Sequence, residues 1–261
     1  MRDFTLEIYK KLLICLKKAG YEFITFEQFC TVKVGENTEN SAKKFIILRH
    51  DVDLKAENSL ETAKIEHDLG ICTTYYFRIV QQSDKPHIIR QIVNLGHEIG
   101  YHYEDLSLFK GDVNQAITHF EKNLAYFRTF YPVRTICMHG NPTSKIDNRN
   151  IWKSISYRKF GIVGEPYFDV DFNKIFYLTD TGRSWNGERF SVRDKVQTSF
   201  NQRFSTTKKI IAAAKRNDLP DKIMITTHPQ RWTNNIVLWL WELLFQSLKN
   251  VIKRTLIIFF R

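Results

Sequence analysis

Short apolar runs alternate with helix-like segments along most of the chain. The runs end close to polar residues and cover residues 45–49, 73–79, 98–103, 134–139, 161–167, 175–179 and 222–227. Segments with helical periodicity lie between them, at 56–69, 86–95, 113–130 and 206–217. Strands that alternate with helices are typical of βαβ units and a parallel sheet. Because the crossovers are short, we predict an α/β fold, a distorted (β/α) barrel with about seven parallel strands, with an open doubly wound sheet as the alternative.

The two ends of the chain have a different pattern. Residues 1–20 repeat apolar side chains at the helical period, so we predict an N-terminal helix, and the charges within it argue against a signal peptide. Residues 235–261 form a second amphipathic pattern. Its polar stripe contains Glu242, Gln246, Lys249 and Lys253. Its apolar stripe contains Leu238, Trp241, Phe245, Leu248, Ile252, Leu256 and Phe259.

This C-terminal segment is not expected to cross a membrane. A spanning helix needs about 20 largely apolar residues, and Glu242 and the basic residues from Lys249 to Arg254 interrupt such a run. We therefore predict a barrel at 1–234 and a C-terminal amphipathic helix at 235–261. That helix either closes the barrel or lies in the plane of a membrane as a peripheral contact.

Composition narrows the class of partner only in part. The 261 residues carry a formal net charge of +11, the basic residues are dispersed, and we recognise no nucleic-acid-binding motif. We expect no nucleic acid partner, whereas an anionic glycan, a lipid-linked sugar phosphate or an anionic membrane would suit the charge. The four cysteines are scattered among apolar neighbours without a C-x-x-C pair. Buried thiols without disulfides are expected, which favours a cytoplasmic protein, either free or peripheral at the inner face of the membrane.

Polar side chains follow the apolar runs at the points where the strands should end. They are Asp51, Asp53, Arg78, His102, His139, Asp180 and His228. The carboxyl ends of the strands in a parallel barrel meet on one face, where active sites are built. Asp51 and Asp53 are two apart and should share one face of their strand, with His50 facing the helix layer. Two close carboxylates need a cation or a shared proton, so this strand end is either half of a metal site or an ordinary solvated salt bridge.

Four motifs resemble the polysaccharide deacetylases with the NodB-homology domain. They are "RHDVD" (49–53), "GHEIGYHYEDL" (96–106), "YLTDTGRSW" (177–185) and "IMITTHP" (223–229), in the family's order. The resemblance spans residues 45 to about 232 and implies Asp51 as the catalytic base, with Asp53 and His102 as metal ligands. It also implies His228 as the general acid. In the third of these stretches, the resemblance implies that Asp180, Arg183 and Trp185 form part of the wall of the site and modulate its catalytic groups.

The sequence departs from the family pattern at two points. Leu106 stands where the family has its second metal-binding His, so a third ligand must come from elsewhere. His139, in "MHGNP", is the first substitute, with Glu104 and Asp105 as alternatives. The Arg of the family's third motif is also missing, which leaves Arg78 and Arg183 as candidates to orient Asp51.

The chemistry of these residue types fits amide hydrolysis. A divalent metal of the zinc class, held by Asp and His side chains, would polarise the carbonyl and activate a water, while Asp51 and His228 move protons. We therefore expect a metal-dependent hydrolase that removes an N-acyl group, acetyl above all, from a sugar in surface polysaccharide biosynthesis or modification. An acylated sugar or glycan, free or lipid-linked, would be the substrate. The alternatives are hydrolysis of another linear or cyclic amide and a catalytically defective barrel that binds glycan.

Overall fold

A single parallel sheet forms the framework of the molecule. The computed structural model describes residues 2–31, 44–140, 144–185 and 196–259, with side chains up to residue 251. The strands are β1 (Glu22–Ile24), β2 (Phe45–Val52), β3 (Thr74–Phe77), β4 (Glu98–Tyr103), β5 (Ile136–Met138), β6 (Phe176–Thr179) and β7 (Lys222–Thr227). Their order is β5-β4-β3-β2-β7-β6, and the short β1 pairs with the first half of β2. Every strand pair is parallel.

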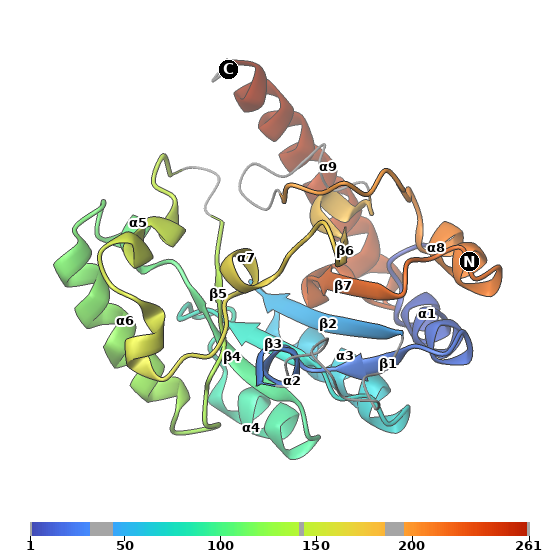
Figure 1. Ribbon diagram of the computed structural model, residues 1–261. Coiled ribbons are helices and arrows are strands. Elements are labelled where there is room, and N and C mark those ends of the chain that lie inside the picture. The colour runs from blue at the N-terminus through green and yellow to red at the C-terminus, as the bar shows by residue number, and fades with distance from the viewer. Residues whose placement is uncertain (1, 32–43, 141–143, 186–195, 260–261) are drawn as a thin grey trace.

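The sheet is curled into a half-barrel with helices around it (Figure 1). Within the described ranges no pairing joins β5 to β6, so the barrel is open between these two strands. The prediction of a distorted (β/α) barrel with about seven parallel strands is confirmed. One predicted strand, at 161–167, is wrong. Gly164 makes only an isolated bridge to Thr135, and Pro166, which has no N–H to donate, instead begins a short helix.

Helices follow most of the strands. They are α1 (Leu6–Lys18), α2 (Phe26–Thr31), α3 (Ala56–Asp68), α4 (Pro86–Asn94), α5 (Asp105–Leu108), α6 (Val113–Phe127), α7 (Pro166–Asp169), α8 (Thr207–Lys215) and α9 (Ile236–Phe259). Short 3₁₀ helices are η1 (Asn148–Lys153), η2 (Tyr157–Phe160), η3 (Thr181–Arg183) and η5 (Pro229–Arg231). Thr5, Asp112 and Thr206 each cap a helix by accepting a hydrogen bond from a backbone N–H of its first turn. The predicted N-terminal helix is confirmed as α1, and its apolar stripe is buried.

The alternation along β2 decides which side chains reach the interior of the half-barrel. All eight residues of β2 are buried. Ile46 and Leu48 pack in the cluster that contains α1 and α8, whereas Phe45 and Ile47 pack on the opposite, inner face. Because side chains two apart share a face, Asp51 falls on the inner face. His50 falls on the helix side, as predicted, and its Nε2 lies 2.8 Å from a carboxylate oxygen of Glu66 in α3.

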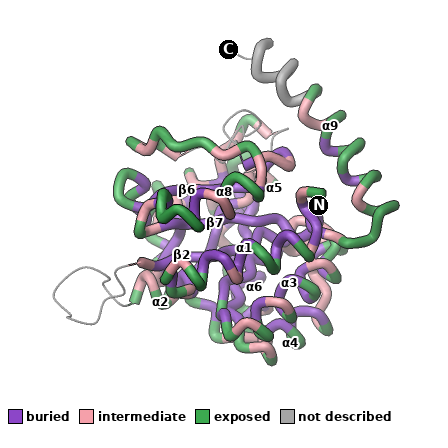
Figure 2. The backbone as a smooth tube through the Cα atoms, turned by 90° about the vertical axis from the view of Figure 1, so that its right-hand side faces the viewer, coloured by how far each residue is buried: buried purple, intermediate pink, exposed green. Residues whose placement is uncertain are grey.

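The cysteines and the C-terminal helix complete the fold. Cys15, Cys30, Cys72 and Cys137 form no disulfide, as expected, but Cys72 is exposed and Cys30 half-buried, which corrects the prediction that all four are buried. Helix α9 packs against η3 and extends beyond the body of the molecule (Figure 2). Among the described residues, no helix has the length and apolar content that crossing a membrane would require.

Candidate active site

The end of β2 places a buried carboxylate beside a buried arginine. Asp51 is 4% exposed, and its Oδ2 lies 3.2 Å from the Nη2 of Arg49, which is 1% exposed. Arg49 is two residues earlier on the same face of β2, and its Nε donates to the Thr226 hydroxyl of β7 at 2.8 Å. The expectation that Arg78 or Arg183 would orient Asp51 is therefore corrected, because the strand itself supplies the partner.

Three further side chains converge next to Asp51. The Oδ1 of Asp53 lies 3.5 Å from the Nε2 of His102 and 3.6 Å from the Nε2 of His139. The other ring nitrogen of His102 bonds to the backbone carbonyl of Cys137 at 2.9 Å, and that of His139 bonds to the Glu104 carboxylate at 2.9 Å. A carbonyl and a carboxylate can only accept, so both Nδ1 atoms carry the proton. Each Nε2 is therefore the ring nitrogen that faces Asp53, and in the neutral imidazole it carries the lone pair.

This donor set fits a divalent metal. Asp53, His102 and His139 each offer one atom, and the three atoms lie within 4.8 Å of one another. The Oδ1 of Asp53 is a buried atom without a hydrogen-bond partner among the described residues, which a cation at the centre of the group would satisfy. One carboxylate and two imidazoles with their second nitrogens already bonded are typical ligands of zinc and related divalent ions.

The electrostatics of the donor set favour positive charge at this point. Burial alone would raise the pKa of Asp53, but His102, His139 and His228 hold it well below its usual range. Burial alone would lower the pKa of His102, but Asp51 and Asp53 raise it. Asp53 is thus ionised in a buried position, and a cationic group is stabilised next to it.

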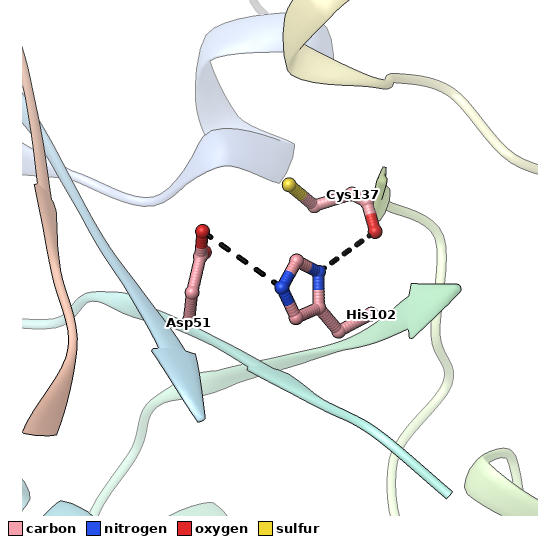
Figure 3. Close-up of side chains that lie close together, drawn as sticks. All are labelled: Asp51, His102 and Cys137. Atoms are coloured by element: carbon pink, nitrogen blue, oxygen red, sulfur yellow. Dashed lines mark hydrogen bonds and ion pairs between the residues drawn. The ribbon is translucent and has the colours of Figure 1, made fainter. Parts of the chain in front are cut away.

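Asp51 borders the donor set. Its Oδ2 lies 3.9 Å from the same His102 Nε2, and Figure 3 shows His102 between Asp51 and the Cys137 carbonyl. The Cys137 thiol is also close enough to form a second group of three donors with Asp51 and His102. One ring nitrogen of His102 therefore faces both carboxylates of β2.

A histidine and an aspartate form the opposite wall. The Nδ1 of His228, just after β7, lies 2.6 Å from Oδ1 of Asp180, and its backbone N–H donates to the other carboxylate oxygen at 3.0 Å. Asp180 also accepts from Arg231 at 2.6 Å and from the Trp232 indole at 2.8 Å. Burial would raise the pKa of Asp180, but Arg231 and His228 outweigh it and hold the value at about 2. The Nε2 of His228 is left facing Asp53, 3.9 Å from its Oδ2.

The alternative third ligands point elsewhere. Glu104 accepts from Arg78 at 2.6 Å and from His139, so it supports a ligand and does not join the donor group. Burial would raise the pKa of Glu104, but His139 and Arg78 hold it at about 2. Asp105 bonds to the Tyr101 hydroxyl and to a histidine of α6, outside the donor group. Of the three substitutes for the residue missing at 106, His139 alone faces Asp53.

Two other predicted site residues have their nearest partners outside the donor group. Trp185 is 3% exposed in the apolar cluster on the helix side of β2, and its indole donates to Thr207 of α8 at 2.8 Å. Arg183 lies over the rings of Phe4 and Trp239, with its guanidinium carbon 5.2 and 4.7 Å from their centroids. The expectation that Trp185 walls the site is therefore corrected, because Trp185 packs against α8 in the helix-side cluster. The same role for Arg183 stays a prediction.

Sequence reasoning missed several residues of the site. Arg49 contacts Asp51, the Cys137 carbonyl accepts from His102, and Arg231 donates to Asp180. The Gln230 amide lies 3.5 Å from Asp53. The signal for Arg49 was present, because it is two residues before Asp51 in a buried strand. Nothing in the local pattern indicated the role of Arg231, which reaches Asp180 from a turn after β7.

Comparison with known proteins found solved structures that have a similar fold. No protein-family model matches the chain, and no curated protein matches it. A solved CE4 family pseudoenzyme from Bacillus anthracis is 12% identical with a TM-score of 0.46, over 79% of this chain and 61% of that one. The family 4 carbohydrate esterase from Streptomyces lividans, in complex with acetate, is 15% identical with a TM-score of 0.41. The match covers 79% of this chain and 90% of that one.

A third solved structure has a similar fold. It is the Xyl-CE4 domain of a multidomain xylanase from the hindgut metagenome of Trinervitermes trinervoides, which is 16% identical with a TM-score of 0.39. The match covers 79% of this chain and 83% of that one. The chain spans about three-fifths of the length of the Bacillus anthracis protein. The likeness to all three structures is one of fold.

Proposed function

We propose that this chain is a metal-dependent hydrolase that removes an N-acyl group, acetyl above all, from a sugar of a surface glycan. One observation carries the proposal. The Asp53, His102 and His139 donor atoms lie within 4.8 Å of one another, and Asp51 and His228 border them from two sides. Metal ligands, a buried carboxylate and an oriented histidine are the parts that hydrolysis of an amide requires.

Asp53, His102 and His139 would hold the metal. A divalent ion there, with zinc as our first choice, would supply a Lewis acid for the acyl carbonyl and lower the pKa of a water. Asp51 is the group placed to accept the proton of the attacking water, because its Oδ2 lies 3.9 Å from a ligand nitrogen. Arg49 fixes that carboxylate in one orientation from 3.2 Å away.

His228 is the group placed to protonate the departing amine. Its Nδ1 is engaged by Asp180 at 2.6 Å, so Nε2 is the nitrogen that exchanges a proton with the site. With its pKa held at about 2, Asp180 is ionised at neutral pH and holds the His228 ring with its Nε2 toward the site. Base and acid thus lie at the ends of two neighbouring strands, β2 and β7, and the Nε2 of His228 lies 3.9 Å from a carboxylate oxygen of Asp53.

The substrate class rests on charge and on the resemblance of the motifs to glycan deacetylases. A net charge of +11 supports an anionic glycan or a sugar carried on a lipid phosphate. The sugar's acyl group is an N-acyl in our proposal, with an O-acyl ester as the second choice. The cytoplasmic setting expected from the cysteines stays a prediction.

Acetate release from defined sugars tests the proposed function. The full chain, loaded with zinc, is incubated with N-acetylated and O-acetylated sugars and oligosaccharides, beside an Asp51→Asn variant. We expect acetate from at least one N-acetylated substrate with the parent and a loss of about 10²–10⁴-fold with the variant. A folded, zinc-loaded parent that releases no acetate and still binds oligosaccharide would instead identify a glycan-binding barrel.

A further inference from the structure

Helix α9 is packed with Glu242 and Gln246 of its polar stripe toward the barrel. Glu242 and Gln246 are 9% and 5% exposed, whereas Trp241, Leu244 and Leu248 are 67%, 66% and 60% exposed. A helix that closes a barrel buries its apolar stripe against the core. The arrangement here is the reverse, and it is visible in Figure 2 as exposed positions along the outside of α9.

Specific contacts fix this orientation. Glu242 lies 3.6 Å from the Lys55 ammonium, and Gln246 donates to Asn250 at 2.8 Å. Asn250 in turn donates to the backbone carbonyl of Gly182 in η3 at 2.9 Å. At the start of the helix, the Trp239 indole donates to the carbonyl of Asp3 at 2.7 Å. The Gln246–Asn250 bond lies within the helix, but rotation of α9 to bury its apolar stripe would break the other three contacts.

The result is a continuous apolar surface, which we call the outer face of α9. It comprises Leu240, Trp241, Leu244, Phe245, Leu248 and Val251, each between 45% and 67% exposed. These positions recur at the helical spacing of three and four residues, so they form one stripe. By sequence the stripe continues through Ile252 and Leu256. A large exposed apolar patch on a soluble domain marks an interaction site.

The charges in the sequence of the C-terminal segment indicate what the outer face binds. The segment 236–261 contains one acidic residue, Glu242, and four basic residues, Lys249, Lys253, Arg254 and Arg261. Glu242 is buried toward the barrel beside Lys55, so basic residues outnumber acidic ones in this segment four to one. A second copy of the chain would bring the same cations and a net charge of +11 to this face, and like charges repel. An anionic bilayer provides both the apolar layer and the opposite charge.

We propose that the outer face of α9 lies in the plane of an anionic membrane and holds the protein at the lipid surface. Trp241 and Phe245 would sit at the level of the headgroups, where aromatic side chains are favoured. The helix also runs beside the candidate active site. Glu242 pairs with Lys55, two residues after Asp53, and Asn250 bonds to η3, which directly follows Asp180. Membrane binding would thus bring the carboxyl ends of β2 and β6 close to the lipid surface, without any dependence on hydrolysis.

Vesicle flotation of the full chain tests this proposal. The vesicles contain phosphatidylcholine alone or phosphatidylcholine mixed with phosphatidylglycerol. We expect the protein to float with the mixed vesicles and much less with phosphatidylcholine alone. Leu244→Glu and Leu248→Glu should each lower the bound fraction about tenfold, because each removes one exposed Leu from the apolar layer. Both side chains are exposed, so thermal unfolding of the variants should match the parent.

Leu108→Glu is the matched control, since Leu108 is 55% exposed on α5, far from α9 in sequence, and receives the same charge. It should float like the parent. Equal flotation of the Leu244→Glu variant and the parent would overturn the proposal. So would a parent that floats with neither vesicle. Sedimentation velocity measures the oligomeric state of the parent and of the Leu244→Glu variant. If the parent does not float and is a dimer, and the Leu244→Glu variant is a monomer, the outer face binds a second copy of the chain.

Discussion

His139, at the end of β5, brings its Nε2 to 3.6 Å from the Oδ1 of Asp53, at the end of β2. Strands β3 and β4 lie between these two strands in the sheet. In a flat sheet the ends of β2 and β5 would be about 14 Å apart, so the curl of the half-barrel is what brings the two side chains together. In our proposal, the same curl would let His139 take the place of the ligand that Leu106 cannot provide.

Support of His139 by Glu104 leads to the first prediction. Glu104→Gln removes a carboxylate that holds the His139 Nδ1 at 2.9 Å and that is ionised at neutral pH. Metal affinity should fall about 10–100-fold, as is usual when the partner of a histidine ligand is lost. Competition titration with a zinc chelator measures the change. Glu121→Gln, an exposed position on α6, should leave the affinity unchanged. Unchanged affinity in Glu104→Gln would remove Glu104 from the support of the site.

The assignment of base and acid gives the second prediction. Asp51→Asn and His228→Ala should each lower kcat about 10²–10⁴-fold, because proton transfer in the transition state is lost. Neither residue belongs to the donor group of Asp53, so both variants should keep their metal. Steady-state kinetics on the best N-acetylated substrate, with metal content measured in parallel, separates the two effects. A parent-like kcat in either variant excludes that residue from the reaction.

Arg49 gives the third prediction. Arg49→Lys keeps a positive charge near Asp51 but cannot bond both Asp51 and the Thr226 hydroxyl as the guanidinium does. We expect kcat to fall about tenfold with KM and metal content unchanged, since a displaced carboxylate affects the chemical step alone. A rise in KM at constant kcat would show that Arg49 acts on substrate binding and does not position Asp51.

A buried carboxylate behind the sheet gives a prediction about pH. Glu66 accepts hydrogen bonds from the hydroxyls of Tyr9, Thr73 and Tyr75, and lies 2.8 Å from His50. Burial would raise its pKa, but His50, His97 and the hydrogen bond from Tyr9 lower it from 4.5 to about 2. Because the pKa of Glu66 is lower in the folded state than in the unfolded state, the ionised carboxylate stabilises the fold at pH values above 4.5. This stabilisation is lost as pH falls from 4.5 toward 2.

Glu66→Gln should therefore lower the free energy of unfolding at pH 7 by about 3 kcal/mol. The difference from the parent should shrink as pH falls below 4.5. Urea denaturation at several pH values measures both. Glu61→Gln on the same helix, in an exposed pair with Lys64, should change stability by less than about 0.5 kcal/mol. A difference that is independent of pH would show that the Glu66 charge does not contribute.

The sequence predicted the sheet and the ends of its strands because these depend on local patterns. The apolar run of β2 and its polar end sufficed to place Asp51 and Asp53, and parallel topology then placed His102 and His139 on the same edge. The prediction failed where the pattern is short or ambiguous. β1 has only three residues and no buried position, so no apolar run marked it. Residues 161–167 have the composition of a strand, but Pro166 ends the extended segment.

Features set by tertiary packing could not be predicted. Trp185 follows Asp180 by five residues, yet the turn of η3 carries it to the helix side of the sheet. The two stripes of α9 were visible in the sequence, but which of them faces the barrel depends on Lys55 and Gly182, which are distant in the chain. Periodicity identifies an amphipathic helix and leaves its orientation to the rest of the fold.

Metal analysis of the purified chain tests the central claim most directly. The parent, Asp53→Asn, His139→Ala and the control His87→Ala, an exposed histidine on α4, are loaded with zinc, passed over a desalting column and analysed for metal and protein. The account predicts one zinc per chain in the parent and in His87→Ala, and a large loss in Asp53→Asn and His139→Ala. A folded parent that retains no divalent metal, or an Asp53→Asn variant that retains its full complement, would contradict it.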